Sequence, residues 1–255
     1  MLIDSHTHLY SEEFDSDIDQ VIQRANEAGI QKFYLPAIDS SYTERMLNLE
    51  AKYPQQMFPM MGLHPTSVKP ESYESELEQV KSWLDKRNFS AVGEIGIDLY
   101  WEKSTLEIQR EAFKKQIGWA KEKSLPIVIH CRESFDEIFE VLEEENGDKL
   151  FGIFHCFTGT KEQAERAIGF NMKLGIGGVV TFKNGKIDQF LNEIPLENIV
   201  LETDSPYLSP VPFRGKRNES SYLKYVVSKL SAIYEISENE IAQITSRNAS
   251  SVFAI

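Results

Sequence analysis

Short apolar runs alternate with longer amphipathic stretches along almost the whole chain. We expect eight of the apolar runs to be strands, at residues 2–9, 32–37, 57–65, 90–98, 126–131, 151–156, 172–178 and 199–204. The stretches between them have helical periodicity, at about 17–29, 42–52, 74–85, 104–123, 135–144, 161–168 and 187–191. Runs that are apolar throughout are typical of strands that are buried on both faces and connected by helices.

Eight strands that alternate with helices favour an α/β fold, a (β/α)8 TIM barrel, which we expect residues 1–255 to form as a single domain. The alternative is an open doubly wound sheet, but no Gly-x-Gly-x-x-Gly turn follows the first apolar run. Residues 221–253 predict two further amphipathic helices. We expect these C-terminal helices to pack on the outside of the barrel.

The charge balance limits the partners that the protein can attract. With 27 basic and 40 acidic residues the net charge is −13, which argues against broad electrostatic attraction to nucleic acid or to anionic membranes. A phosphate-bearing ligand would therefore be held by local contacts. No apolar run approaches the roughly 20 residues of a membrane span, and the N-terminal residues do not resemble a signal peptide. We expect a cytoplasmic protein without membrane contact, and no obligate protein partner is evident.

The two cysteines, Cys131 and Cys156, each directly follow a histidine. If the histidines face inward along strands, the cysteines face the opposite way. We expect buried, reduced thiols, and the alternative is that they are metal ligands or a disulfide.

Histidines and acidic residues gather at one kind of position. All five histidines and four acids fall at the carboxyl ends of predicted strands: His6, His8, His64, His130, His155, Glu94, Asp98, Glu202 and Asp204. The active site of a barrel is built at these ends. His6 and His8 are one residue apart and would point the same way along a strand. Each residue alone is more often a structural cap or a satisfied buried group, so it is the shared position that predicts a site.

Imidazoles and carboxylates are typical ligands of divalent ions such as zinc, manganese, iron or magnesium. The number of candidate ligands predicts two ions. The expected ligands are His6, His8 and Asp204 for one ion, His130 and His155 for the other, and Glu94 as a bridge between the two. Two ions held this close can activate a water and stabilise both the attacking and the leaving oxygen, which is typical of hydrolases.

Several motifs match the pattern of a known family. They are Asp4-Ser5-His6-Thr7-His8, Gly62-Leu63-His64-Pro65, Gly93-Glu94-Ile95-Gly96-Ile97-Asp98, Gln109 with Phe113 and Gln116, Leu125-Pro126-Ile127-Val128-Ile129-His130, Phe154-His155-Cys156-Phe157, Gly177-Gly178 with Thr181-Phe182-Lys183, and residues 201–208. On these motifs the sequence resembles the TatD family of metal-dependent deoxyribonucleases, within the amidohydrolase-like metallohydrolases. The resemblance spans nearly the whole chain.

The resemblance implies a deoxyribonuclease that uses two divalent ions, Mg, Mn or Zn, to hydrolyse phosphodiester bonds of DNA. Asp204 would be both a ligand and the general base, and Glu94 would take the place of the carboxylated lysine that bridges the ions in broader relatives. His64 would contact phosphate or assist the leaving oxygen, and its alternative is a cap on the turn before Pro65. We expect an exonuclease on single strands or strand ends, because a deep barrel mouth admits a terminus more readily than a duplex.

Further residues at the same ends are candidates for the substrate site. Glu202 lies two residues before Asp204 and should face the same interior, where it would orient a ligand or help to hold an extra ion. For Glu202, as for Asp98, the alternative is a satisfied polar layer of the barrel. Arg132, and Arg214 within the basic loop 212–218, could seat phosphates.

Aromatic residues on the loops of the same face could stack on unpaired bases, or they could be plain packing. They are Tyr100, Trp101, Tyr207 and Phe213. The chain departs from the family pattern at Phe213, where the pattern has a histidine, and at Ser220, where it has a proline.

Two other classes of function compete with the nuclease. Related barrels use nearly the same ligands to hydrolyse C–N or ester bonds in small molecules or aminoacyl esters. The third possibility is a metal-binding partner protein that has lost catalysis. The complete set of predicted ligands argues against this last class.

Overall fold

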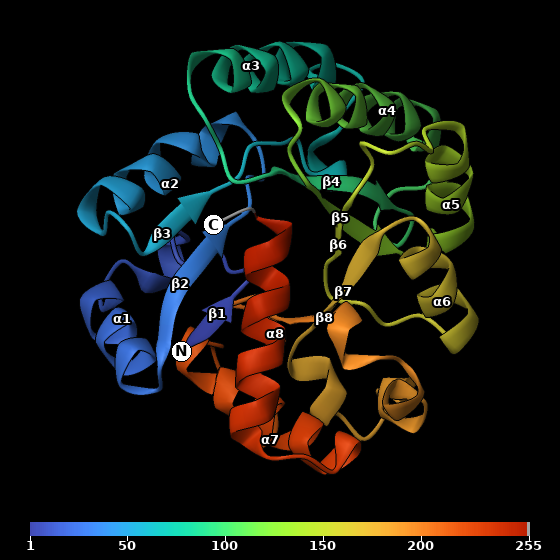
Figure 1. Cartoon of the computed structure of the whole chain (residues 1–255). Coiled ribbons are helices and arrows are strands. Elements are labelled where there is room, and N and C mark those ends of the chain that lie inside the picture. The colour runs from blue at the N-terminus through green and yellow to red at the C-terminus, as the bar shows by residue number, and fades with distance from the viewer. Residues whose placement is uncertain (254–255) are drawn as a thin grey trace.

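Eight parallel strands form a ring that is surrounded by helices (Figure 1). The computed structural model describes residues 1–253. The strands are β1 (Leu2–Asp4), β2 (Ile30–Leu35), β3 (Met57–Pro59), β4 (Val92–Asp98), β5 (Ile127–Arg132), β6 (Gly152–Phe154), β7 (Met172–Ile176) and β8 (Ile199–Leu201). Hydrogen bonds group them into two sheets in chain order, β1–β3 and β4–β8.

Contacts on both sides join these sheets. A parallel bridge between Met61 and Val92 connects the segment after β3 to β4. On the other side, the Ser5 amide donates to the Leu201 carbonyl at 2.9 Å and connects β1 to β8. The predicted (β/α)8 arrangement is therefore confirmed.

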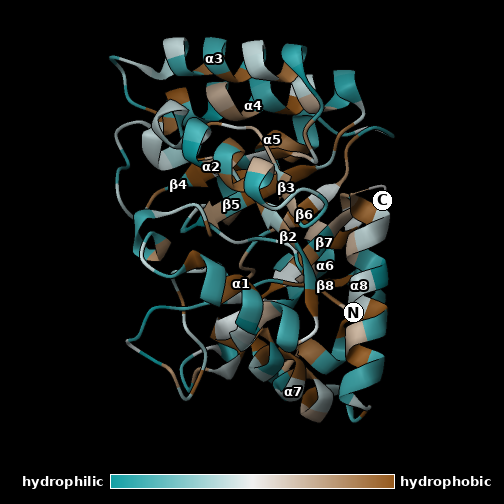
Figure 2. Cartoon of the chain, turned by 90° about the vertical axis from the view of Figure 1, so that its left-hand side faces the viewer, coloured by the Kyte–Doolittle hydropathy of each residue, from teal (hydrophilic) through white to brown (hydrophobic). Residues whose placement is uncertain are grey.

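The α-helices surround the strands, with their polar sides facing outward (Figure 2). They are α1 (Ile18–Glu27), α2 (Ser40–Lys52), α3 (Tyr73–Lys86), α4 (Leu106–Lys123), α5 (Phe135–Glu144), α6 (Lys161–Gly169), α7 (Leu223–Tyr234) and α8 (Glu238–Val252). The helix predicted at 187–191 is wrong, because this segment forms two 3-10 turns, Lys186–Gln189 and Leu191–Glu193. Ile187 and Leu191 are buried in these turns, so the apolar spacing that predicted a helix is met by two short 3-10 turns.

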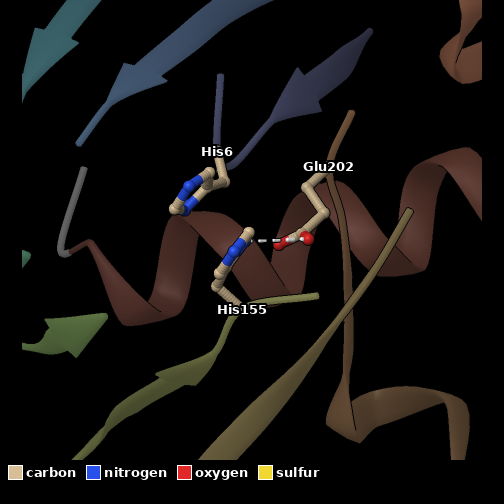
Figure 3. Close-up of side chains that lie close together, drawn as sticks. All are labelled: His6, His155 and Glu202. Atoms are coloured by element: carbon tan, nitrogen blue, oxygen red, sulfur yellow. Dashed lines mark ion pairs between the residues drawn. The ribbon is translucent and has the colours of Figure 1, made fainter. Parts of the chain in front are cut away.

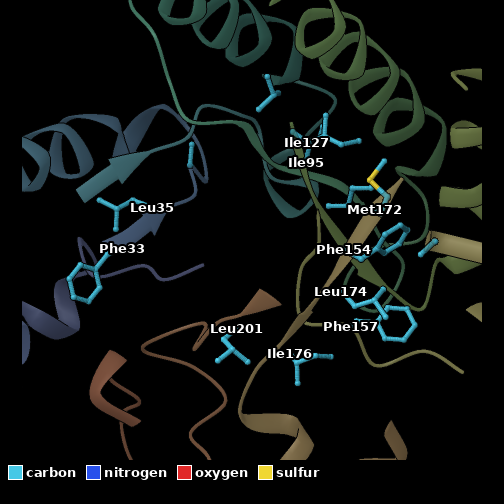
Figure 4. Close-up of a cluster of buried hydrophobic side chains, with 14 of the residues drawn as sticks. Phe33, Leu35, Ile95, Ile127, Phe154, Phe157, Met172, Leu174, Ile176 and Leu201 are labelled. Carbon is cyan, nitrogen blue, oxygen red and sulfur yellow. The ribbon is translucent and has the colours of Figure 1, made fainter. Parts of the chain in front are cut away.

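Strand residues alternate between two apolar layers. Ile127 and Ile129 of β5 belong to the large cluster between the strands and the helices, part of which is drawn in Figure 4. Val128 between them points into the ring, where it joins Ile153 and Val200 in a second cluster. By the same alternation His130, two residues after Val128, points inward.

The two C-terminal helices lie outside the ring, as predicted, and α8 also covers the amino-terminal end of the strands. Ala249, Val252 and Phe253 extend the inner cluster. Asn248 donates to the carbonyls of Leu196 and Ile199, at 2.8 and 2.7 Å. The opposite end of the ring is left for the polar residues. Across the described residues, no helix is both long enough and apolar enough to cross a bilayer.

Several strands are shorter than predicted. β1 ends at Asp4, so His6 and His8 do not lie on a strand, and the predicted reason for their shared direction is wrong. The chain instead continues along its neighbours through single hydrogen bonds, from the Thr7 amide to Tyr34 and from the His8 amide to Ser205. β3, β6 and β8 also end early, before His64, His155 and Glu202. The polar residues thus stand on the first turns after the strands.

Cys131 and Cys156 are free thiols, as predicted, but both are only partly buried. Cys131 packs against the outer cluster, on the face opposite to His130. Burial raises the pKa of Cys131 to about 12, which keeps this thiol protonated at neutral pH.

Candidate metal centre

One oxygen of Glu94 faces the first group of predicted ligands. Glu94 is 1 % exposed, and its Oε2 lies 3.1 Å from His6 Nε2 and 3.7 Å from His8 Nε2. Asp204 Oδ1 lies 3.7 Å from His6 Nε2 and 3.5 Å from His8 Nε2. His6, His8 and Asp204, which we call the first group, therefore direct their donor atoms at one place beside Glu94.

The other oxygen of Glu94 faces the remaining histidines. Glu94 Oε1 lies 2.8 Å from His130 Nδ1, 3.3 Å from His64 Nε2 and 3.4 Å from His155 Nε2. We call His64, His130 and His155 the second group. The structure thus brings all five histidines together around one carboxylate.

The position of Glu94 depends on an irregularity in β4. The pairing register between β4 and β5 shifts between Gly93 and Ile95, so Glu94 has no partner in the ladder. Its amide instead donates to the Ala37 carbonyl at 3.2 Å. Such bulges commonly redirect a side chain at a functional site.

Tyr10 holds His8 and is a residue that sequence reasoning missed. The Tyr10 hydroxyl lies 2.9 Å from His8 Nδ1 and donates its hydrogen to the Pro36 carbonyl. A hydroxyl has one hydrogen, so the contact with His8 requires that Nδ1 carries the proton and donates it. His8 Nε2, the atom that faces Glu94, is therefore left with a free lone pair. A tyrosine two residues after the His-x-His pair was the only signal for this role.

His64 has the opposite arrangement. The backbone amide of Thr66 donates to His64 Nδ1 at 3.1 Å, so neutral His64 carries its proton on Nε2. The predicted alternative, a cap on the turn before Pro65, is present. The same ring directs an N–H group into the site, which is a donor and not a free ligand atom.

Asp98 supports His130 from the side away from Glu94. Asp98 Oδ2 lies 2.8 Å from His130 Nε2, so His130 has a carboxylate at each ring nitrogen. Burial would raise the pKa of Asp98, but hydrogen bonds from His130 and from the amides of Trp101 and Tyr100 outweigh burial and lower it. An ionised Asp98 keeps the Nε2 proton of His130 in place and leaves Nδ1 for an ion.

Glu202 lies behind His155, not in the open site. The rings of His6 and His155 are stacked at 3.6 Å, and Glu202 Oε1 lies 3.1 Å from His155 Nδ1 (Figure 3). Glu202 is fully buried and also accepts from the Cys156 amide at 2.7 Å. Gly175 makes room for this carboxylate, since a Cβ atom there would lie 2.2 Å from Glu202 Oε2. Of the predicted roles of Glu202, the contact with substrate is not supported, because protein atoms cover it, whereas the orientation of a ligand fits.

The donor set fits divalent cations. Both ring nitrogens of His6 are buried, and neither makes a well-aligned hydrogen bond within residues 1–253, although Nε2 lies 3.1 Å from Glu94 Oε2. Buried polar groups are seldom left unpaired, and an ion between His6, His8 and Asp204 would satisfy Nε2. Three overlapping groups of side chains have ligand atoms close enough to share an ion: His6, His8 and Asp204; His64, Glu94 and His130; and His6, His155 and Glu202.

The carboxylates of the centre are held in their ionised form. Burial would raise the pKa of Glu94, but the charges of His155, His64 and His6 outweigh it and place this pKa well below its usual value. The pKa of Asp204 is likewise lowered, by His8, His155 and His6 against the effect of burial. Burial would lower the pKa of His155, but Glu94 and Glu202 raise it to about 10. A cation that replaces this proton would have ionised carboxylates ready to receive it.

Asp4 connects the first group to the segment that follows β8. Its carboxylate accepts from the Thr203 hydroxyl at 2.6 Å, the Thr203 amide at 3.0 Å and the Ser220 hydroxyl at 2.7 Å. Ser220, where the family pattern has a proline, thus supplies a donor to a buried acid. Burial raises the pKa of Asp4 to about 7 in spite of these hydrogen bonds. The role of Asp4 was not found from the sequence, since the motif alone does not show what a buried acid contacts.

The predicted substrate residues lie in different surroundings. Arg132 is exposed, and its guanidinium lies 3.7 Å from the Tyr100 ring centroid. Arg214 is also exposed and lies over Phe182 at 3.5 Å. Arg217 of the same loop is paired with Asp17 at 2.7 Å, so the loop is less basic than its sequence indicates.

The aromatic residues also differ in their exposure. Trp101, Tyr207 and Tyr100 are 68 %, 50 % and 49 % exposed. The Tyr207 ring lies 6.0 Å from the ring of His8. Phe213 is instead stacked on Tyr222 at 4.2 Å, so this residue is packed against protein and is poorly placed to stack on a base.

Comparison with known proteins gives one family along the whole chain. The family described as TatD related DNase matches residues 3–254. The uncharacterized metal-dependent hydrolase YabD of Bacillus subtilis is 39 % identical, and the alignment covers 100 % of both chains. The 3'-5' ssDNA/RNA exonuclease TatD of Yersinia pseudotuberculosis is 30 % identical, again over 100 % of both chains.

A solved structure agrees with these sequences. The crystal structure of YjjV, a TatD homolog from Escherichia coli K12, is 31 % identical, with a TM-score of 0.93 over 100 % of this chain and 98 % of that one. The ring of strands, the histidines around Glu94 and the full-length matches lead to one conclusion. The chain belongs to the TatD related DNase family and is a metal-dependent hydrolase.

Proposed function

We propose that this protein hydrolyses phosphodiester bonds of DNA, as an exonuclease that acts on single strands or strand ends with two divalent ions. The observation that carries the proposal is that the two oxygens of Glu94 face different histidines. Its Oε2 faces His6 and His8, and its Oε1 faces His130 and His155. A carboxylate with a different set of ligands at each oxygen is suited to bridge two cations. The exonuclease name of the Yersinia relative supports the choice of substrate.

We assign the ligands as the geometry groups them. His6, His8 and Asp204 would hold one ion, His130 and His155 the other, and Glu94 both. Bound Mg, Mn or Zn would supply a Lewis acid that polarises the phosphoryl oxygens and makes a water more acidic. A mixed set of imidazoles and carboxylates accepts several of these metals, so availability would select among them.

The protein's own groups would move the protons. Asp204 is ionised and its side chain is 13 % exposed, so its carboxylate can accept a proton from the attacking water. His64 carries a hydrogen on Nε2 and can donate it to a phosphate oxygen or to the leaving oxygen. The exposed guanidinium of Arg132 can pair with a phosphate.

The test is cleavage of end-labelled single-stranded DNA by the metal-loaded protein and its Asp204→Asn variant. We expect shortening from one end, with activity at least about 100-fold lower in the variant, because a positioned general base contributes on the order of 10²–10⁴-fold. Asp148→Asn is the matched control, since Asp148 is exposed on the turn before β6, at the other end of the ring. Its activity should equal that of the unchanged protein.

Two results would contradict the proposal. Equal cleavage by the Asp204→Asn variant would exclude Asp204 as the base and indicate a contaminating nuclease. No cleavage with magnesium, manganese or zinc, together with turnover of an amide or ester panel, would replace the nuclease with the alternative hydrolase. The cytoplasmic location stays a prediction from the sequence.

A further inference from the structure

An exposed aromatic surface lies next to the second group of the centre. It consists of Tyr100 and Trp101, on the turn after β4, and Arg132 at the end of β5, and we call it the aromatic platform. Trp101 is 68 % exposed, the highest value for a large aromatic residue in the part of the chain that the structure describes. The Tyr100 ring is covered by the Arg132 guanidinium at 3.7 Å and stands nearly perpendicular to the Trp101 ring, at 89°. The platform therefore leaves the Trp101 ring open to a ligand.

A single carboxylate connects this platform to the metal centre. Asp98 Oδ1 accepts from the Tyr100 and Trp101 amides, both at 3.0 Å, while its Oδ2 lies 2.8 Å from His130 Nε2. The residue that orients His130 thus also fixes the backbone of the platform. A ring on this turn is held at a constant position relative to His130.

We propose that the platform binds an unpaired base of the nucleotide next to the phosphodiester that is cleaved, with the base stacked on Trp101 and Arg132 near the adjoining phosphate. This inference rests on the proposed function and specifies its substrate as single-stranded. Base stacking is tolerant of sequence, because every base has a π face. Arg132, whose guanidinium is 5.5 Å from the Trp101 centroid, can contribute both charge and a planar surface.

The charge of the protein favours this occupant. At a net charge of −13 the molecule has no broad field that attracts phosphates. Part of the binding energy for a nucleic acid must therefore come from contacts that do not depend on that field, and stacking is one. Inside a duplex both faces of each base are already covered by neighbouring pairs. An unpaired base is the form of nucleic acid that can offer a free face to Trp101.

The experiment measures binding apart from cleavage. A fluorescently labelled single-stranded pentathymidylate is titrated with metal-loaded Asp204→Asn protein, with and without Trp101→Ala, and its anisotropy is recorded. We expect Trp101→Ala to weaken binding about tenfold for the thymidylate and less than twofold for an abasic strand of the same length. Trp83→Leu, on the outer helix α3, is the matched control and should leave both affinities unchanged. Bound thymidylate should also quench tryptophan fluorescence in the Asp204→Asn protein and not in the variant without Trp101.

The outcomes separate the platform from the proposed function. Equal weakening of the thymidylate and the abasic strand, no weakening, or no binding of thymidylate at all would overturn the platform. If the unchanged protein cleaves single-stranded DNA and Trp101→Ala binds it normally, the platform is wrong and the nuclease stands. If binding depends on Trp101 but the metal-loaded protein cleaves no DNA, the platform is supported and the nuclease is wrong.

Discussion

The two halves of the metal centre are supported in different ways. In the second group, His64 Nδ1 accepts from Thr66 and His130 Nε2 faces Asp98. In the first group His8 has a supporting partner outside the centre, Tyr10, but neither ring nitrogen of His6 has one within residues 1–253. All three rings of the second group therefore have a supporting residue, since Glu202 Oε1 lies 3.1 Å from His155 Nδ1. The orientation of His6 depends on its stacking against His155 and on what binds beside it.

This difference shows which histidines the protein orients before an ion binds. Outer partners fix the proton of a histidine and the direction of its free nitrogen, so they prepare a ligand before any ion is present. The second group is prepared in this sense. The first group is completed by Asp204, which lies on a turn in a left-handed backbone conformation with φ of 56° and is held through its amide to the His6 carbonyl. Four substitutions test the comparison, in order of expected effect.

The change Glu94→Gln should impair both groups, because this carboxylate faces both of them. We expect nuclease activity to fall on the order of 10⁴-fold, since loss of a metal's charge stabilisation costs several kcal/mol. Metal content measured by atomic emission should fall for both ions. Glu107→Gln on the exposed side of α4 is the control. Retention of both ions by Glu94→Gln would show that the two groups do not share Glu94.

The change Asp4→Asn tests how the buried acid that supports the first group makes stability depend on pH. The pKa of Asp4 is raised from 3.8 to about 7, so between these values the folded protein keeps a proton that the unfolded chain has released. The stabilisation that comes from holding this proton is therefore complete below pH 3.8 and is lost as the pH rises to about 7. The free energy of unfolding should fall by up to about 4 kcal/mol over this range.

In the Asn variant this loss should disappear. Urea unfolding of both metal-free proteins from pH 4 to pH 8 measures the difference between their free energies of unfolding. If that difference does not change with pH, Asp4 does not titrate in this window. Ser220→Ala, which keeps the acid and removes one donor, should move the loss of stability to higher pH.

The change Asp98→Asn should make the second group resemble the first. The amide would keep its oxygen toward the Tyr100 and Trp101 amides and turn its NH₂ toward His130, which moves the proton of His130 to Nδ1. We expect about 10- to 100-fold weaker binding of one of the two ions, by isothermal titration calorimetry. Loss of affinity for both ions in equal measure would contradict the separate support of the groups.

The change Tyr10→Phe should have the smallest effect and widen the difference between the groups. It removes the oxygen that accepts from His8 Nδ1 and leaves the ring in place. We expect affinity for the ion of the first group to fall several-fold, with a mixed tautomer of His8 in ¹⁵N NMR spectra. The Tyr42→Phe variant, whose ring lies 6.0 Å from that of Tyr10, is the control. An unchanged His8 spectrum would show that Tyr10 does not set the tautomer.

The sequence by itself determined the order of the elements and the end of the barrel where the site is built. Apolar runs such as 126–131 have enough β-branched residues to define buried strands, and their spacing admits helices between them. His130 could be placed inward by counting from the apolar residues of its own strand. The segment 187–191 could not be judged in this way, because the spacing of Ile187 and Leu191 fits two 3-10 turns as well as a helix.

Only the tertiary structure decided which side-chain atoms of the site contact one another. His6 and His8 share a side through separate hydrogen bonds to β2 and to the segment after β8, and a pattern along the chain does not contain those partners. The proton positions of His8 and His64 are set by Pro36, through Tyr10, and by Thr66. The burial of Glu202 behind His155 likewise follows from the order of β6, β7 and β8 in the sheet. Local periodicity gives a residue its face, but distance and protonation depend on neighbours that are remote in sequence, and these are fixed only when the ring closes.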